Sequence, residues 1–321
     1  MQTKLITVIS LFAALILVNC NDDGSSDETD QTGTHSTADT GNDDRTDSAG
    51  DTVRGDDAVP GVDTSVPGSI GCGATAWPEE GPKQITIDSL DREYIITFPA
   101  SYSSENPYKV IFAWHGLGGT AEQTLGNEWW GYYGMKNLAD DNTIFIAGQG
   151  LPSDGGTDYK WDNKDGRDVA YTRAIYDWLL KNYCIDTNRV FGIGFSYGGI
   201  MSNTVGCYLG DIFRAVAPMS GSGPGSWMDG SPPGDCVGKV ATWLIHGSAD
   251  TTVEPVQGER SRDYWLDDNN CGDTTIPVDP APCVQYQGCD DGYPVYWCYH
   301  DGDHMLPDWV GQGAWDFFAQ F

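Results

Sequence analysis

Ser196 stands in Gly194-Phe195-Ser196-Tyr197-Gly198, a Gly-x-Ser-x-Gly arrangement. Glycines on both sides of a serine permit a sharp turn from a strand into a helix, and this turn leaves the hydroxyl exposed above the strand end. Residues 189–193 are apolar enough for such a strand, and residues 196–208 are compatible with the helix. The context therefore predicts that Ser196 is a nucleophile for acyl transfer. A serine hydroxyl is weak at its ordinary pKa, so this chemistry also requires a base and an orienting acid.

Five histidines compete for the role of base. His304 lies in a turn-rich segment near the C-terminus, ahead of a helix-like stretch at 309–318. We expect His304 to be the base, with His300 as the alternative. Gly302 lies between them and argues against a helical pair of metal ligands. His246 ends an apolar run, where a polar side chain often only braces the loop.

The expected acid is Asp250, which closes the segment 241–250. It lies between Ser196 and His304 along the chain, and this order is that of the α/β-hydrolase fold. Loop capping is the alternative role for Asp250, and Glu254 is then the first substitute as the acid.

An oxyanion needs two backbone donors, and the sequence offers a candidate for each. His115-Gly116-Leu117-Gly118-Gly119 follows the apolar run 110–114. Such a His-Gly-rich loop can supply the amide of Leu117, and the residue after the nucleophile, Tyr197, can supply the other.

Aromatic residues follow this loop in the segment 127–134, which includes Trp130, and Trp161 lies further along. Aromatic faces beside an ester site could stack on a phenolic acid or a sugar ring. Packing within the core is the alternative for both tryptophans.

The elements that must position these residues are short apolar runs with helical or loop segments between them. Continuous apolar runs of this length are typical of buried parallel strands. The strand candidates are 110–114, 143–147, 189–193, 215–217 and 241–245, after a hairpin at 84–87 and 93–98. The helix candidates are 168–183, 196–208 and 309–318. This alternation predicts an α/β fold with a mostly parallel sheet and helices on both faces.

The N-terminal part differs from the rest of the chain. Residues 5–18 are largely apolar behind Lys4, as in a signal peptide, and the segment 1–20 ends at Cys20 as in bacterial lipoproteins, although Asn19 departs from that pattern. We expect Cys20 to carry lipid, with an ordinary export signal as the alternative. Residues 21–69 hold 13 acidic and 2 basic residues and no large apolar side chain, which predicts a disordered linker. Residues 70–321 then form the catalytic domain.

Charge and cysteine content narrow the function classes further. The net charge of -30 opposes binding to nucleic acid or anionic lipid. Without Cys20, eight cysteines remain, and an even number in an exported domain predicts up to four disulfides of unknown pairing. These are Cys72, Cys184, Cys207, Cys236, Cys271, Cys283, Cys289 and Cys298. Zinc binding by the last four is the weaker alternative, because no Cys-x2-Cys pair occurs there.

Taken in order, these motifs resemble secreted feruloyl esterases, which belong with the polyhydroxybutyrate-depolymerase-like esterases and some acetylxylan esterases. The likeness spans 71–321 and includes Trp161, 183–186 and 302–304 besides the segments above. It implies hydrolysis of hydroxycinnamate esters on plant arabinoxylan, with Ser196, Asp250 and His304 as the triad and with no metal or organic cofactor. We therefore expect a feruloylated or acetylated polysaccharide, or a small aryl ester, as substrate, and a secreted or cell-surface location. The oligomeric state stays open.

Three other functions remain as alternatives. The chain could be an acetylxylan esterase or a polyhydroxyalkanoate-type depolymerase. From another class, it could be a surface lipoprotein that binds carbohydrate without catalysis.

Overall fold

A computed structural model describes residues 68–75, 78–127, 130–153, 155–224 and 236–321. The expected signal segment, Cys20 and the linker up to residue 67 lie outside this part. The folded domain begins by Gly68, two residues before the expected boundary. Gly68 bridges to Asp186, and the buried Ser69 hydroxyl accepts a hydrogen bond from the amide of Ile185 at 3.0 Å.

A ten-stranded sheet runs through the domain in the order β1-β2-β4-β3-β7-β8-β9-β12-β11-β10. Its strands are β1 (Gly81–Ile87), β2 (Leu90–Thr97), β3 (Tyr108–Trp114), β4 (Thr143–Gly148), β7 (Ile185–Phe195), β8 (Ala215–Met219), β9 (Ala241–Gly247), β10 (Thr275–Pro277), β11 (Cys283–Tyr286) and β12 (Val295–His300). The six strands from β4 to β12 are parallel, and antiparallel strands flank them at both edges. Every residue of β3, β4, β8 and β9 is buried, which explains their uninterrupted apolar sequences.

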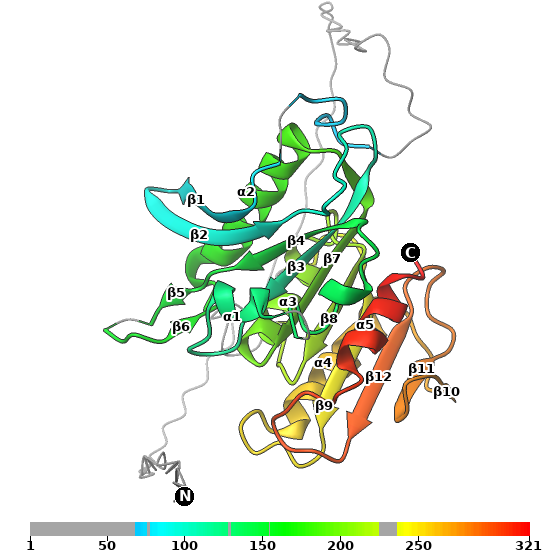
Figure 1. Ribbon diagram of the computed structural model, residues 1–321. Helices are drawn as coiled ribbons and strands as arrows, with labels where there is room; N and C mark the ends of the chain where they lie inside the picture. The colour runs from blue at the N-terminus through cyan, green and yellow to red at the C-terminus, as the bar shows by residue number, and fades with distance from the viewer. Residues whose placement is uncertain (1–67, 76–77, 128–129, 154, 225–235) are drawn as a thin grey trace, which may run out of the picture. The chain divides into compact units, whose positions relative to one another are not determined.

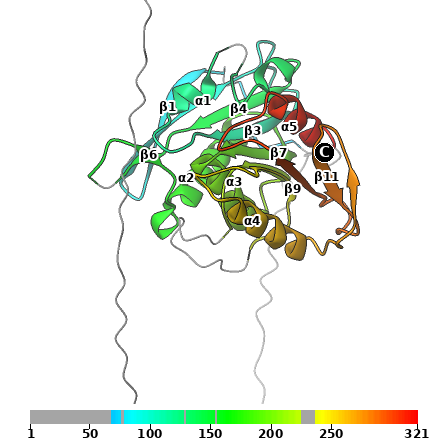
Figure 2. The same cartoon turned by 90° about the horizontal axis from the view of Figure 1, so that it is seen from below.

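Helices cover both faces of the sheet (Figures 1 and 2). On one face lie α2 (Arg167–Asn182), α3 (Tyr197–Tyr208) and α4 (Pro255–Asp268), whose buried side chains join one hydrophobic cluster. On the other lie α1 (Ala121–Leu125) and α5 (Val310–Phe318), which join a second cluster. Short elements complete the domain: β5 (Leu151–Pro152), β6 (Tyr159–Lys160) and the 3-10 turns Lys136–Leu138 and Lys164–Gly166. The expected α/β-hydrolase architecture is confirmed.

The eight cysteines form four disulfides, as the even count predicts. The pairs are Cys72–Cys184, Cys207–Cys236, Cys271–Cys289 and Cys283–Cys298. The zinc alternative for the last four cysteines is therefore wrong, because thiols joined in disulfides provide no thiolate ligands. Within the described part of the chain, no helix combines the length and the apolar composition needed to cross a bilayer.

Candidate active site

Ser196 lies at the turn between β7 and α3 in a backbone conformation that side chains rarely adopt, with φ 59° and ψ −118°. Both flanking glycines are required there. A Cβ on Gly198 would lie 2.0 Å from the carbonyl oxygen of Trp114, and one on Gly194 would lie 2.3 Å from the carbonyl oxygen of Gly198. The Ser196 amide donates to the carbonyl of Met219 at 2.9 Å. The pentapeptide thus forms the sharp turn that its glycines predict.

Asp250 and His304 come from two different loops that meet at the carboxyl ends of neighbouring strands. Asp250 follows β9, His304 follows β12, and these strands are parallel neighbours. The His304 Nδ1 lies 2.7 Å from Asp250 Oδ2. Asp250 is 3% exposed, and its Oδ1 accepts hydrogen bonds from the amides of Thr252 and Val253 at 2.9 and 2.8 Å. The carboxylate is therefore fixed on one side by its own loop and faces the imidazole on the other.

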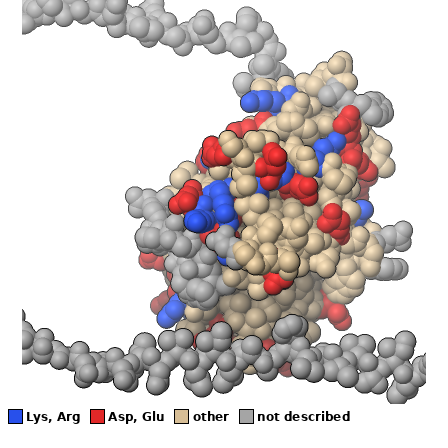
Figure 3. All heavy atoms as spheres, turned by 90° about the vertical axis from the view of Figure 1, so that its left-hand side faces the viewer, with Lys and Arg blue, Asp and Glu red and all other residues tan. Residues whose placement is uncertain are grey.

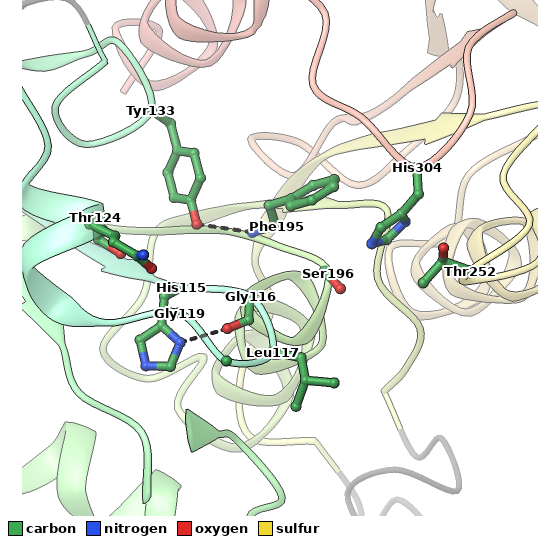
Figure 4. A pocket seen from close by; sticks show the side chains of 12 residues that line it. His115, Gly116, Leu117, Gly119, Thr124, Tyr133, Phe195, Ser196, Thr252 and His304 are labelled. Atoms are coloured by element: carbon green, nitrogen blue, oxygen red, sulfur yellow. Dashed lines mark hydrogen bonds between the residues drawn. The ribbon is translucent and has the colours of Figure 1, made fainter. Parts of the chain in front are cut away.

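A hollow of about 570 Å³ lies beside Ser196 and His304 (Figure 4). Ser196 and His304 both line it, and in Figure 4 the His304 ring extends from its loop toward the Ser196 hydroxyl. The Phe195 ring packs against the His304 ring with 4.6 Å between centroids. The pocket therefore holds a hydroxyl and an imidazole, and the imidazole also contacts a buried carboxylate.

The glycine-rich loop after β3 forms the opposite wall of this pocket. Gly116 lies so close to the nucleophile that a Cβ there would be 3.5 Å from the Cβ of Ser196. Leu117 is 54% exposed and lines the pocket, and Tyr197 starts α3. Neither the Leu117 nor the Tyr197 amide donates a hydrogen bond to another described residue. Both amides are thus available to an oxygen beside Ser196.

His115 supports this loop from below. Its Nδ1 lies 2.7 Å from the carbonyl oxygen of Gly116, and its Nε2 accepts from the amide of Gly150 at 3.0 Å. Burial lowers the pKa of His115 to about 4, so the ring is neutral and donates through Nδ1. Trp161 lies against it, and the indole Nε1 donates to the carbonyl of His115 at 3.0 Å. His115 is therefore a brace of the loop.

The two expected substrate-binding tryptophans differ in their surroundings. Trp161 is 1% exposed and is absent from the pocket wall, so we correct its expected role: it holds the loop from beneath. Trp130 is 51% exposed and lines a neighbouring hollow, which shares Tyr133 with the main pocket.

Sequence reasoning missed Tyr133. Its hydroxyl donates to the carbonyl of Trp114 at 2.5 Å and accepts from the amide of Phe195 at 3.3 Å, so it joins the ends of β3 and β7 beside the pocket. The signal was present, because Tyr133 belongs to the aromatic segment that includes Trp130, but ring orientation cannot be read from residue type.

Two further groups stabilise the acid and base loops. Burial lowers the pKa of His246, and its neutral Nε2 donates to the carbonyl of Val253 at 2.8 Å. Asp303, which sequence reasoning did not single out, accepts through Oδ1 from the amides of Thr251 at 3.0 Å and His304 at 2.8 Å. These hydrogen bonds, first that from Thr251, lower the pKa of Asp303, so its charged form ties the two loops together.

His300, the alternative base, lies elsewhere. It is 7% exposed, and its Nδ1 accepts from the amide of Gly302 at 3.1 Å. It lines a separate hollow.

Across the described ranges, no three His, Cys, Asp or Glu side chains gather as metal ligands would.

Comparisons with known proteins identify relatives of this chain. A family model described as prolyl oligopeptidase family matches residues 155–228, which include Ser196. Feruloyl esterase D of Neurospora crassa is 31% identical over 285 residues, covering 82% of this chain and 94% of that protein.

Two solved structures share the fold. An acetyl xylan esterase from Aspergillus awamori aligns with a TM-score of 0.59 at 18% identity over 74% of this chain and 99% of its own. A ferulic acid esterase from Anaeromyces mucronatus, solved with ferulic acid, aligns with a TM-score of 0.51 at 16% identity over 76% of this chain and 91% of its own.

Proposed function

Because this chain belongs to the feruloyl esterases, we propose that it is a serine esterase that releases hydroxycinnamates from feruloylated plant arabinoxylan. The observation that best supports this activity is the 2.7 Å contact between Asp250 and His304 at the pocket that also holds Ser196. The apolar and aromatic side chains of Leu117, Tyr133 and Phe195 contribute to the pocket walls and suit an aryl group.

The proposed reaction proceeds in two acyl-transfer steps. In the first, His304 takes the proton of the Ser196 hydroxyl as the oxygen attacks the ester carbonyl, and the amides of Leu117 and Tyr197 hold the oxyanion. His304 then gives that proton to the departing alcohol, which leaves an acyl-enzyme. In the second step, water loses a proton to His304, attacks the acyl carbon and releases the carboxylic acid, while the proton returns to Ser196. Asp250 holds the imidazole in the tautomer with Nδ1 protonated throughout.

A single substitution tests this assignment. We expect Ser196→Ala to abolish hydrolysis of methyl ferulate, with a loss of at least about 10⁵ in kcat, because the nucleophile is removed. The circular dichroism spectrum and Tm should stay close to those of the unmodified protein. Activity near the original level in a folded Ser196→Ala variant would overturn the assignment.

The choice of ester requires a substrate panel. Methyl ferulate, acetylated xylan and short polyhydroxybutyrate represent the proposed function and the two alternative esterase activities. We expect the highest kcat/KM with the ferulate ester. A preference for acetylated xylan or the polyester would replace the feruloyl assignment, and no hydrolysis of any of the three would favour a non-catalytic carbohydrate-binding protein.

We also propose that the protein is exported and held at the cell surface by lipid on Cys20. The four disulfides support export, because such bonds persist in oxidising compartments. The anchor is argued from the sequence around Cys20 alone. Mass spectrometry of the mature N-terminus tests it: a diacylglyceryl cysteine is expected, and a mature chain that begins elsewhere without lipid would contradict the anchor.

A further inference from the structure

A second hollow, of about 590 Å³, lies beyond the carboxyl end of β12. We call it the β12 pocket, and the residues that matter in its lining are Tyr299, His300, Asp301, Met305 and Trp309. The segment 301–307 carries His304 into the Ser196 pocket and contributes Met305 to the β12 pocket. One loop therefore separates the reacting groups from this second hollow, at the strand ends where open α/β sheets bind ligands.

His300 carries a buried donor that the described protein leaves without a partner. Its Nδ1 accepts from the amide of Gly302 at 3.1 Å, so the proton of the neutral ring sits on Nε2. Burial lowers the pKa of His300, which keeps the ring neutral. The Nε2 is buried and has no hydrogen-bond partner among the described residues. Buried donors normally have acceptors, so this unpaired donor on a pocket-lining residue points to an acceptor oxygen that the described protein does not supply.

The rest of the lining combines apolar faces with a carboxylate. The Tyr299 ring is 36% exposed and stacks on the buried Trp297 ring at 5.4 Å, which fixes its orientation. Met305 is 51% exposed, Trp309 adds a second aromatic ring, and Asp301 adds acceptor oxygens at the rim. A sugar ring presents an apolar C–H face together with hydroxyls that donate and accept, so it matches this lining. The strongly acidic chain disfavours an anionic ligand.

The location fits the alcohol half of the ester. This step rests on the proposed function, in which His304 protonates the departing alcohol and the alcohol must therefore lie on the His304 side of Ser196. We infer that the β12 pocket binds a neutral sugar residue of the polysaccharide that bears the ester. The sugar would stack on Tyr299, with its hydroxyls toward His300 and Asp301.

Two ferulate esters of different size test this inference. Methyl ferulate has no sugar, whereas a feruloylated arabinoxylan oligosaccharide can reach the β12 pocket. We expect Tyr299→Ala to raise KM for the oligosaccharide ester about five- to tenfold, in line with loss of one aromatic–sugar contact, and to leave kcat and KM for methyl ferulate within about twofold. Tyr293→Ala is the matched control, because this tyrosine precedes β12 at its other end and packs against Arg214.

The outcomes separate the inference from the proposed function. Equal losses on both esters, or no loss on either, would overturn the sugar site while leaving the esterase assignment intact. If the unmodified protein cleaves neither ester, the proposed function fails, and calorimetry with the unesterified oligosaccharide decides the pocket by itself. Binding that Tyr299→Ala and Asp301→Ala both weaken, and that Tyr293→Ala does not, supports the site, and binding unaffected by either pocket variant overturns it.

Discussion

At the scale of single residues, the site depends on the buried Asp250 carboxylate, whose Oδ2 lies 2.7 Å from the His304 Nδ1 and 3.5 Å from the His246 Nε2. The residues that do this could be anticipated because each belongs to a short motif: a serine between glycines, an aspartate that ends an apolar segment and a histidine in a turn near the C-terminus. The roles of Trp161 and Tyr133 could not be anticipated. Whether an aromatic ring faces a pocket or lies beneath it depends on contacts with segments distant in sequence, such as that between Trp161 and the His115 carbonyl.

Asp250→Asn tests the contact with His304 directly. The amide has nearly the same shape, but it loses the negative charge and can present a donor to Nδ1, which favours the wrong tautomer of the imidazole. We expect kcat for methyl ferulate to fall by about 10³–10⁴ with little change in Tm. Asp316→Asn is the control, because this exposed carboxylate on α5 bonds only to Gln312 among the described residues. A loss below tenfold in Asp250→Asn would remove Asp250 from the proposed triad.

At the scale of elements, the sequence predicts the central strands and the first hairpin, β1 and β2, better than the later elements α4 and β10 to β12. The strands β3, β4, β8 and β9 are buried on both faces and so have uninterrupted apolar sequences. In contrast, α4 has only three buried residues, Gly258, Ser261 and Trp265, which is too few for a clear periodic signal. The short strands β10 and β11 are partly exposed, and the Cys283–Cys298 disulfide joins β11 to β12. Their pairing depends on long-range contacts that local pattern does not encode.

A buried ion pair connects strand β2 to helix α2. Arg92 of β2 donates to Asp168 of α2 at 2.8 Å, and both side chains are at most 1% exposed. The same guanidinium donates to the carbonyl of Gln149, and the Gln149 side chain accepts from the amide of Ala121. The ion pair thus stabilises the core and, through Gln149, also helps to position α1, which follows the glycine-rich loop.

Asp168→Ala should therefore lower the free energy of unfolding by about 3–5 kcal/mol, because it leaves the buried Arg92 charge without its carboxylate partner. Urea denaturation with the disulfides intact measures this change. The matched control is Arg173→Ala, which removes an ion pair with Asp211 whose side chains are 42% and 44% exposed and should cost less than about 1 kcal/mol. If the two variants lose similar amounts of unfolding free energy, burial does not determine how much these ion pairs contribute to stability.

At the scale of the whole molecule, acidic residues outnumber basic residues by 47 to 17. On the face shown in Figure 3, acidic and basic side chains lie interspersed. Composition alone could indicate that polyanions are poor partners, but it carries no information about buried ionisable groups. Only the folded structure shows that His115 and His246 are buried and that burial lowers their pKa values, which keeps both imidazoles neutral.

Stability should therefore fall with acidification. The pKa of His115 is about 4 in the folded protein and near 6.5 in an unfolded chain, so between these values the unfolded state binds more protons. As pH falls from about 6.5 to about 4, this group should remove up to about 3 kcal/mol of unfolding free energy, and His246 acts in the same direction. Urea denaturation at several pH values should show a shallower pH dependence in His115→Gln than in the unmodified protein. Parallel curves would contradict a buried, neutral His115.

Covalent labelling tests most directly whether Ser196 is an activated nucleophile. The full chain is treated with a fluorophosphonate, digested and mapped by mass spectrometry, alongside Ser196→Ala and His304→Gln. We predict one phosphonylated residue, Ser196, with no label in Ser196→Ala and labelling of His304→Gln slowed by at least about 10³. A label on another residue, or a Ser196 that does not react in the folded protein, would contradict the assignment of Ser196 as the nucleophile.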